Sequence, residues 1–406
     1  MISLTEAQAF TFSRLRSLPE VEIEAASAVG YYLAGPVVAV TDVPPFANTA
    51  VDGYALRFEE AANPPTRLHL AGEIAAGATS QGVELAPGST VRVLTGAPLP
   101  AGTSAVVMVE DTRLDGDTVL VTKTLREGEN IRDAGSDIVQ GASLFRAGTK
   151  ITPAILGVLT SIGVKKVAVF GKPRVGVIST GDELSDESQL APGKIYDSNR
   201  PTLLGLVAEA GAIPVDLGRI RDDKALLSAA FSQAAKDLDA VITTGGVSVG
   251  DYDYTKVVLE ELSGGSMRWM QVAIKPAKPY AFGYIGGTPL FGLPGNPVSS
   301  VVSFELFVRP ALLMLQGASV VKRPVVLATA TTAFRRHQDG KLHFNRALAS
   351  ATSEGELKVG AVGIQGSHVL SGLAGSNCLA LIPDGEGAAV GDRIKVMLTG
   401  EIRGDQ

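Results

Sequence analysis

The middle of the chain alternates between apolar runs and segments with helical spacing, and this alternation constrains the fold more than any other feature. Runs typical of strands at 174–179, 213–217 and 240–243 alternate with helical patterns at 199–210 and 222–235. The alternation predicts a parallel sheet with helices on both faces. Ligands of such sheets bind outside the carboxyl ends of the strands, so a binding site is expected there.

Changes in sequence texture predict four structural units. Residues 44–138 contain short β-type runs separated by Gly, Pro and Asp clusters, which is typical of a small all-β module. The flanking segments 1–43 and 139–171 are similar to each other, so the module is interpreted as an insertion that splits one elongated domain. The α/β unit is expected over 172–321, and short strands with Gly-rich turns predict a β domain over 322–406.

Two helices have strong start signals. Ser3 followed by Glu6 is the pattern of a capping box, and this first helix is expected to end before Pro19. Asn296 and Pro297 suit the N-cap and the first position of a helix that runs over 297–315.

Composition argues against several classes of protein. Lys and Arg number 36 against 42 Asp and Glu, a balance of −6 that does not favour nucleic-acid or anionic-membrane partners. One cysteine, Cys378, and four scattered histidines offer no spacing typical of a zinc site. The N-terminus lacks the features of a signal peptide, and the uncharged stretch 279–304 contains too many Gly and Pro residues for a membrane span. A cytoplasmic protein is therefore expected.

Three glycine-containing loops follow strands of the α/β unit: STGDE at 179–183, TTGGVSVGD at 243–251 and GLPGNP at 292–297. Backbone N–H groups in such loops can approach a phosphate closely, although each loop alone could be a plain tight turn. Their shared position at one sheet edge favours anion binding, and none fits the Walker A or GxGxxG motif. The loop residues expected to bind the ligand are Ser179, Thr180, Gly181, Gly245, Gly246 and Ser248.

Acidic residues near the same strand ends could hold Mg²⁺, which prefers oxygen ligands and normally brings a substrate phosphate with it. They are Asp182, Glu183, Asp222, Asp251 and Asp253. For Asp222 the alternative is a purely structural role, because acidic residues are favoured at a helix N-terminus.

Two further places could carry chemistry or could be plain surface. Lys275 and Lys278 lie in the proline-stiffened segment KPAKP, where they could clamp an anion or form a solvated pair. Asp52 precedes Gly53 in a polar loop of the β-rich first half, where a simple turn is the alternative.

Taken together, these segments resemble the MoeA family of molybdopterin molybdotransferases, which includes the E-domain of gephyrin. The matching motifs follow the family's order: NTAVDGY (48–54), LTGAP (94–98), GENIRDAGSD (128–137), STGDEL (179–184), DSNR (197–200), TGGVSVGD (244–251), AIKPAKP (273–279) and GLPGNPVS (292–299).

The resemblance implies both a fold and a reaction. The fold is multidomain α/β plus β: an elongated split domain, an inserted β module, a doubly wound α/β domain like that of the molybdopterin adenylyltransferases, and a C-terminal β barrel. It also implies a homodimer whose active site lies between the α/β domain of one subunit and the inserted module of the other. The implied reaction inserts molybdate into adenylated molybdopterin and releases AMP with the help of Mg²⁺.

The resemblance also implies roles for individual residues. Asp52, Thr95, Glu183, Asp222 and Asp253 match catalytic positions, with Glu183 and Asp222 as ligands of Mg²⁺. Substrate-binding or oxyanion-binding positions are matched by Asp137, Lys275, Pro294, Pro297, Arg346 and Ser367, and Lys278 is expected to join them. Some relatives have a second lysine where this chain has Gln271, so the way in which it holds the oxyanion is expected to differ in part.

Two other functions stay open. An adenylyltransferase of the preceding step would have a similar α/β unit, although the additional β modules and NTAVDGY favour the later step. That adenylyltransferase is also an expected partner. A dimeric scaffold is the second alternative, because the gephyrin E-domain anchors partners.

Overall fold

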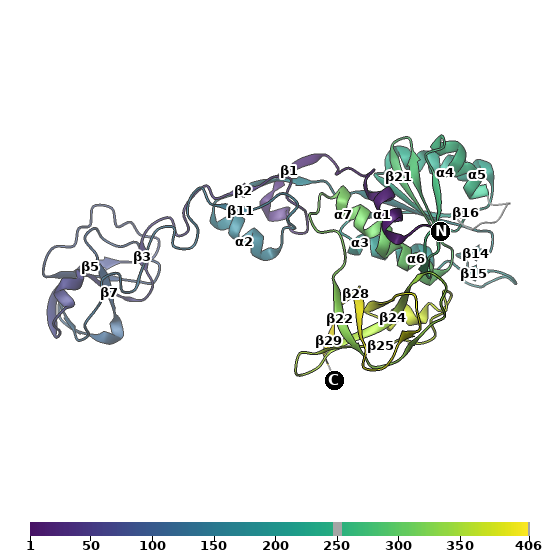
Figure 1. Ribbon diagram of the computed structural model, residues 1–406. Helices are drawn as coiled ribbons and strands as arrows, with labels where there is room; N and C mark the ends of the chain where they lie inside the picture. The colour runs from purple at the N-terminus through teal and green to yellow at the C-terminus, as the bar shows by residue number, and fades with distance from the viewer. Residues whose placement is uncertain (247–253, 405–406) are drawn as a thin grey trace.

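The chain forms an elongated molecule, with a small β module at one end and an α/β domain beside a β barrel at the other (Figure 1). This computed structural model describes residues 1–246 and 254–404.

The slender middle of the molecule is built from two chain segments that are far apart in sequence. Strand β1 (Glu20–Glu24) pairs antiparallel with β12 (Lys166–Phe170), and β2 (Val37–Val38) pairs with β11 (Ser143–Phe145). Helix α2 (Pro153–Ser161) has Thr152 as its N-cap, and the Thr152 side chain accepts a hydrogen bond from the Ile155 amide. A short 3₁₀ turn, Ala25–Ser27, follows β1.

The inserted module is a six-stranded sheet in the order β7-β4-β6-β5-β9-β8. Its strands β5 to β7 and β9 fall on the β-type runs of the sequence at 66–71, 90–95, 105–110 and 118–122, whereas β4 and β8 were not predicted. Strands β3 (Asn48–Thr49) and β10 (Ile131–Arg132) pair at its base. The sheet strands are β4 (Gly53–Leu56), β5 (Thr66–Ile74), β6 (Ser89–Val93), β7 (Ala105–Met108), β8 (Thr112–Asp115) and β9 (Thr118–Val121).

The α/β domain contains a six-stranded sheet in the order β16-β13-β17-β21-β20-β18. The first four strands are parallel, as the alternation predicts, whereas the additional strands β20 and β18 are antiparallel to their neighbours. Gly286 and Gly287, both at positive φ, join β20 to β21 in a tight hairpin, and a two-residue loop can only connect antiparallel strands. The strands are β13 (Arg174–Thr180), β16 (Ile213–Ile220), β17 (Ala240–Thr244), β18 (Arg268–Gln271), β20 (Pro279–Ile285) and β21 (Thr288–Leu293).

Helices cover both faces of this sheet, as the alternation predicts. On one face lie α1 (Leu4–Phe12), α3 (Asn199–Glu209), α6 (Pro297–Ser303) and α7 (Arg309–Leu315), whose apolar side chains share one core. On the other face lie α4 (Lys224–Asp237) and α5 (Tyr254–Ser263), packed through a second core.

Both predicted helix starts are present, with one difference at the second. The capping box of Ser3 and Glu6 is formed on both sides. Asn296 is the N-cap of α6, but its side chain makes no capping hydrogen bond. A π-helical turn, Phe304–Val308, joins α6 to α7. The span Pro297–Leu315 is long and apolar enough to cross a membrane, yet 83% of its most apolar window is buried in the protein, as in a core helix.

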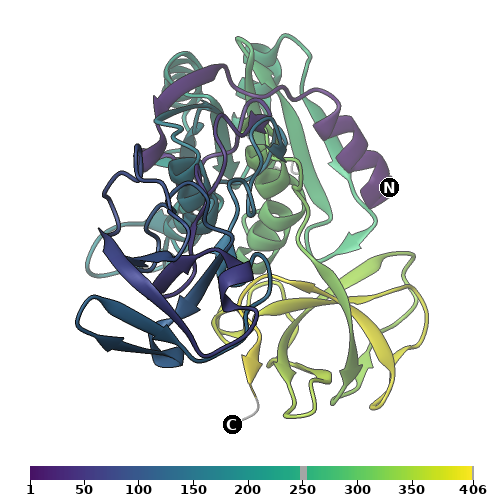
Figure 2. The same ribbon diagram turned by 90° about the vertical axis from the view of Figure 1, so that its left-hand side faces the viewer.

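The C-terminal strands close into a five-stranded barrel, as expected. The closed order is β24-β25-β22-β28-β26, with β26 pairing back to β24. Figure 2 shows the barrel packed beside the α/β domain. Strand β19 (Ile274–Lys275), from the α/β domain, pairs with β24 and joins the two. The strands are β22 (Val325–Ala330), β24 (Leu342–Ala351), β25 (Leu357–Ala361), β26 (Cys378–Ile382) and β28 (Arg393–Leu398), with the short β23 (Phe334–Arg335), β27 (Gly387–Ala388) and β29 (Arg403–Gly404) at the rim.

Candidate functional site

The carboxyl ends of three neighbouring parallel strands meet at one edge of the α/β sheet and border a cavity. Loops after β13, β17 and β21 converge there because these strands are adjacent in the sheet. The cavity has a volume of about 580 Å³. Six of the residues expected from the sequence line it: Thr180, Glu183, Gly245, Gly246, Pro294 and Pro297.

Glycine is required in two of these loops. Gly245 has φ +92°, and a Cβ there would lie 2.6 Å from the carbonyl oxygen of Thr180. Gly181 has φ +139°, and a Cβ would lie 2.4 Å from the carboxylate of Glu183, which folds back over it. The absence of side chains therefore lets the β13 and β17 loops pack together at the edge of the cavity.

Asn199, at the start of α3, ties two loops of this cavity together. Its Nδ2 donates to the Thr244 hydroxyl oxygen at 2.9 Å and to the Gly295 carbonyl oxygen at 2.7 Å. Sequence reasoning missed this residue, although it lies in the DSNR motif that contributed to the resemblance. An asparagine directly after a strand-end loop was the available signal.

A chain of hydrogen bonds fixes the segment that carries Asn199. The buried Ser179 hydroxyl donates to Asp197 at 2.5 Å, and Asp197 accepts from the Arg200 guanidinium at 3.0 Å. Arg200 also donates to both carboxylate oxygens of Asp216 at 2.8 and 2.6 Å. Burial lowers the pKa of Arg200, but its bonds to Asp216 and Asp197 outweigh burial and raise it. Ser179 is thus a support of the cavity wall and does not line the cavity.

The expected magnesium ligands lie close to the same edge. Glu183, Asp182 and Asp222 are exposed, and the amides of Asp182 and Asp222 each donate to the other's carboxylate, at 3.3 and 3.4 Å. Among the residues that the structure describes, no group of three or more His, Cys, Asp or Glu side chains could hold a metal. Ser248, Asp251 and Asp253 lie outside the described residues.

A second cavity, of about 850 Å³, lies where the α/β domain meets the barrel. It shares Pro279, Pro294 and Asn296 with the first cavity, so the two adjoin. Its lining is rich in cations, and no carboxylate is present among the lining residues within the described part of the chain. The expected Lys275, Lys278 and Ser367 line it, together with Arg335, Arg336, His337, Lys341 and His343.

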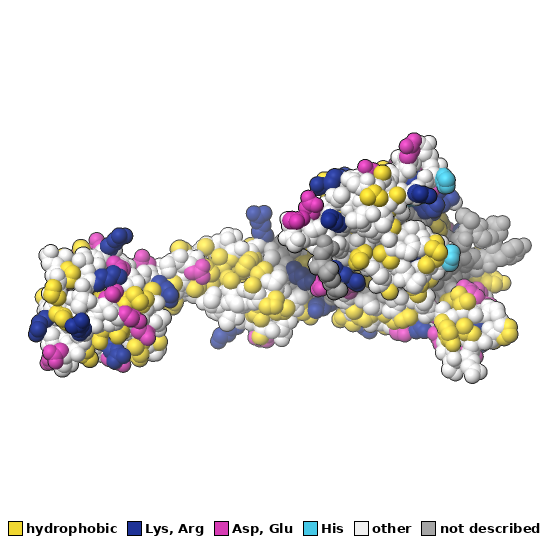
Figure 3. All heavy atoms as spheres, turned by 90° about the horizontal axis from the view of Figure 1, so that it is seen from below, with side chains coloured by type: hydrophobic (Ala, Val, Ile, Leu, Met, Phe, Trp, Pro, Cys, Tyr) yellow, Lys and Arg dark blue, Asp and Glu magenta, His cyan; other side chains and the backbone are white. Residues whose placement is uncertain are grey.

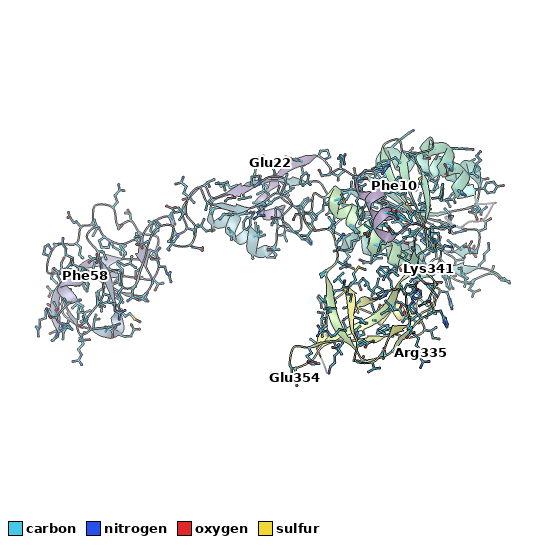
Figure 4. All side chains as sticks on the ribbon, viewed as in Figure 1. Phe10, Glu22, Phe58, Arg335, Lys341 and Glu354 are labelled. Carbon is cyan, nitrogen blue, oxygen red and sulfur yellow. The ribbon has the colours of Figure 1, made fainter. Side chains whose placement is uncertain are left out.

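The cations from the barrel were not predicted, although Arg335, Arg336 and His337 are consecutive in the sequence. Figure 4 shows Lys341 on the barrel side of the junction with the α/β domain. Arg336 is held by Asp339 at 2.9 Å and by Asp384 at 2.5 Å. The barrel therefore adds its own cationic side chains to the lining of the cavity.

Asp339 holds several of these barrel cations in place. It accepts hydrogen bonds from Lys341 at 3.1 Å and contacts His343 Nε2 at 3.1 Å. Burial opposes its ionisation, but these two partners outweigh burial and lower the pKa of Asp339 to about 2. Burial lowers the pKa of His343, and the bond to Asp339 only partly offsets this. His343 is the register partner of Lys275, so the network also fixes the lysine segment.

Arg346 lies behind the basic cavity rather than in it. Its side chain is buried, and its guanidinium donates to the carbonyl oxygens of Val369 and Ile364. Burial lowers the pKa of Arg346. The arginine thereby shapes the loop that carries Ser367, which lines the cavity.

Asp52 and Thr95 form a second polar centre in the inserted module, and this module lies at the far end of the molecule (Figure 1). Asp52 Oδ1 accepts from both the Thr95 amide and the Thr95 hydroxyl, each at 2.7 Å. The amide and then the hydroxyl of Thr95 lower the pKa of the exposed Asp52 carboxyl. Asp137 is exposed beside the same module. Within one chain, these three residues are not brought to the α/β cavity.

The glycine after Asp52 has a structural cause. A Cβ on Gly53 would lie 2.1 Å from the Val107 carbonyl oxygen, because β4 packs closely against β7. This close approach accounts for the glycine, whereas the Asp52 carboxylate ties its own loop to that of Thr95.

Three comparisons give the relatives of this chain. Residues 2–163 match the MoeA N-terminal region (domain I and II), residues 176–314 match the "Probable molybdopterin binding domain", and residues 329–399 match the MoeA C-terminal region (domain IV). A protein of Haemophilus influenzae named molybdopterin molybdenumtransferase is 36% identical over 390 residues, which cover 95% of this chain and 96% of the relative. Molybdopterin molybdenumtransferase 2 of Mycobacterium tuberculosis is 37% identical over 393 residues, with 95% and 96% covered.

Among solved structures, the molybdopterin biosynthesis MoeA protein of Pyrococcus horikoshii superimposes with a TM-score of 0.83 at 30% identity. The match covers 98% of this chain and 100% of that one. Sequence and fold thus agree over nearly the whole length, and the chain belongs to the MoeA family of molybdopterin biosynthesis proteins.

Proposed function

We propose that this protein is a Mg²⁺-dependent molybdopterin molybdotransferase that uses adenylated molybdopterin and molybdate and releases AMP. The observation that carries the proposal is the pair of adjoining cavities. One is surrounded by glycine loops and carboxylates, as a phosphate-bearing substrate requires, and the other is lined by cations, as an oxyanion requires. The relatives named molybdopterin molybdenumtransferase support the same reaction.

The residues divide the work between the two cavities. Gly245 and Gly246 allow backbone N–H groups to approach the adenylyl phosphate, and Lys275 and Lys278 hold molybdate. Pro294, on the border of both cavities, lies between the two anions. The reaction breaks the phosphoanhydride bond between AMP and the pterin, so charge on its oxygens must be neutralised.

Glu183 and Asp222 would hold Mg²⁺ in this account. Their oxygen donors suit the ion, which in phosphate sites usually takes one or two carboxylates and completes its shell with water and substrate phosphate. When bound, Mg²⁺ supplies positive charge to the phosphate oxygens.

The complete site would require two subunits. Asp52 and Thr95 are exposed and belong to the inserted module, which lies at the other end of the molecule from the α/β domain. Figure 3 shows apolar side chains on the slender middle of the molecule, where Val40 and Val139 are 58% and 61% exposed. Such a surface suits the contact of a homodimer, which would bring the inserted module of one subunit to the α/β cavity of the other. We place this dimer in the cytoplasm.

The direct test is AMP release from adenylated molybdopterin by the purified chain. The proposal expects AMP only when Mg²⁺ and molybdate are both present. Release that is independent of the oxyanion, or no release at all, would contradict it. A parallel reaction with ATP and molybdopterin tests the adenylyltransferase alternative, which requires pyrophosphate as a product. A scaffold without activity would yield neither product.

A further inference from the structure

A two-stranded flap projects beside the α/β cavity and carries an exposed aromatic ring. Its strands are β14 (Leu184–Ser185) and β15 (Ile195–Tyr196), which pair in parallel (Figure 1). Tyr196 and Ile195 both line the cavity, and each is 54% exposed. Neither residue has a role in the proposed chemistry described above.

The flap is fastened to the loop that carries Glu183. The Ile195 amide donates to the Glu183 carbonyl oxygen at 2.9 Å, and the Lys194 ammonium donates to the Asp182 carbonyl oxygen. The Tyr196 hydroxyl donates to the Ser188 carbonyl oxygen at 3.1 Å, which orients the ring. The ring is therefore held in place relative to the proposed phosphate site, while the residue remains largely exposed.

The position of Tyr196 in the sequence limits how far its ring can lie from the loops after β17 and β21. Tyr196 is three residues before Asn199, whose side chain contacts the loops after β17 and β21. Three residues span at most about 10 Å, which is the scale of a ribose and one phosphate. Apolar groups from Leu184, Ile195 and Pro297 line the same cavity, so a flat ring could be covered on both faces.

We propose that Tyr196, with Ile195 beside it, is the stacking wall for the adenine of the adenylyl group. A phenol ring stacks on a base through its π face and needs no particular hydrogen bond from the base. The assignment rests on the proposed function for the identity of the substrate, because the pterin of the same substrate is also a flat heterocycle. Tyr196 would then be a specificity-determining residue, placed by the flap at the base end of the cavity.

Equilibrium binding of AMP to the full-length protein tests this assignment without requiring turnover. Tyr196→Ala should weaken AMP binding by about tenfold, within the range for stacking of one base on an aromatic ring. Tyr196→Phe should stay within about twofold of the wild type because it keeps the π face. Leu190→Ala, at an exposed position in the connection between β14 and β15 that does not line the cavity, is the matched control and should change nothing.

Ligands without adenine show whether Tyr196→Ala loses only base stacking or disrupts the whole cavity. Ribose 5-phosphate should bind wild type and Tyr196→Ala equally, whereas an equal loss for this ligand would mean that the flap is only structural. Unchanged AMP binding in Tyr196→Ala, or no AMP binding by the wild type, would overturn the assignment. If Tyr196→Ala weakened the binding of neopterin and left the binding of AMP unchanged, the ring would be assigned to the pterin and the adenine assignment would be refuted.

The two proposals fail in different ways. A wild-type protein that binds AMP with this dependence on Tyr196, yet releases no AMP from adenylated molybdopterin, refutes the proposed reaction and supports the stacking wall. A protein that turns over while Tyr196→Ala keeps the same KM for the adenylated substrate refutes the stacking wall alone.

Discussion

The side-chain amide nitrogen of Asn199 donates a hydrogen bond to the carbonyl oxygen of Gly295 across a distance of 2.7 Å. The same nitrogen donates to Thr244, so the amino-terminal end of α3 holds together two loops that arise from different strands. Three elements of the α/β cavity therefore keep a fixed geometry before any ligand is bound, which is how a site avoids the cost of ordering loops on binding.

Removing this amide should loosen the cavity. Asn199→Ala leaves the Gly295 carbonyl without its donor, so we expect kcat/KM for AMP release to fall by about tenfold or more, with a loss of about 1–3 kcal/mol in the free energy of unfolding. Steady-state kinetics and chemical denaturation measure both. Thr202→Ala is the control, because its hydroxyl bonds only the Ser198 carbonyl within the same helix. Equal effects of the two variants would mean that helix α3, and not the loop contact, is responsible.

Glu183 should matter for turnover and not for folding. Its carboxylate is exposed and lies over Gly181, so Glu183→Ala creates no buried cavity and should leave the unfolding transition unchanged. We expect this variant to lose oxyanion-dependent AMP release because a phosphate-neutralising carboxylate is missing. Glu187→Ala, an exposed acid on the flap that does not line the cavity, should remain active. Full activity of a folded Glu183→Ala protein would remove Glu183 from the mechanism.

Lys275 should lower the molybdate concentration that is needed for AMP release. Loss of one charge-assisted contact costs about 1.5–3 kcal/mol, so Lys275→Ala should raise the molybdate concentration for half-maximal AMP release by about tenfold or more. Lys278 lines the same cavity and should compensate in part, whereas the neutral Gln271 cannot. Titration of molybdate against wild type, Lys275→Ala and Lys278→Ala decides this. The exposed Lys236→Ala on α4 is the control, and an unchanged titration for all three variants would identify the lysines as a solvated pair.

Stability should depend on pH through His343. Burial lowers the pKa of His343 from its ordinary value of 6.5, so near this pH the unfolded chain binds more protons than the folded protein. The resulting stability is present above pH 6.5 and is lost as the pH falls through the folded-state pKa, with a slope of at most about 1.4 kcal/mol per pH unit. Denaturation between pH 5 and 7.5 should show a flatter dependence for His343→Asn. His337→Asn, at an exposed histidine, is the control, and identical slopes in all proteins would contradict the prediction.

Much of the α/β domain followed from the sequence because its signals are local. The apolar runs became β13, β16 and β17, and the loops after β13 and β17 fall at the predicted edge. The antiparallel strands β18 and β20 were not predicted, because an uncharged run does not encode strand polarity. The decisive signal was the two-residue Gly286-Gly287 turn, which predicts a hairpin.

The contacts between distant segments could not be predicted in the same way. Asn199 forms hydrogen bonds with residues 45 and 96 positions away in the sequence. The cationic lining of the second cavity combines Lys275 of the α/β domain with Arg335 and Lys341 of the barrel. In neither case does the type of one residue, or its spacing along the chain, indicate which distant residue it will contact. The burial of Arg346 was equally inaccessible, since an arginine in a strand gives no sign that loop carbonyls will surround it.

Complementation between two inactive chains tests the central claim, a transferase site completed by two subunits, most directly. Asp52→Ala and Glu183→Ala are expected to be inactive alone. If each site joins the inserted module of one subunit to the α/β cavity of the other, a heterodimer of the two chains contains one intact site. Random mixing of equal amounts should then restore about a quarter of wild-type AMP release. Verified heterodimers that stay inactive would contradict the shared site.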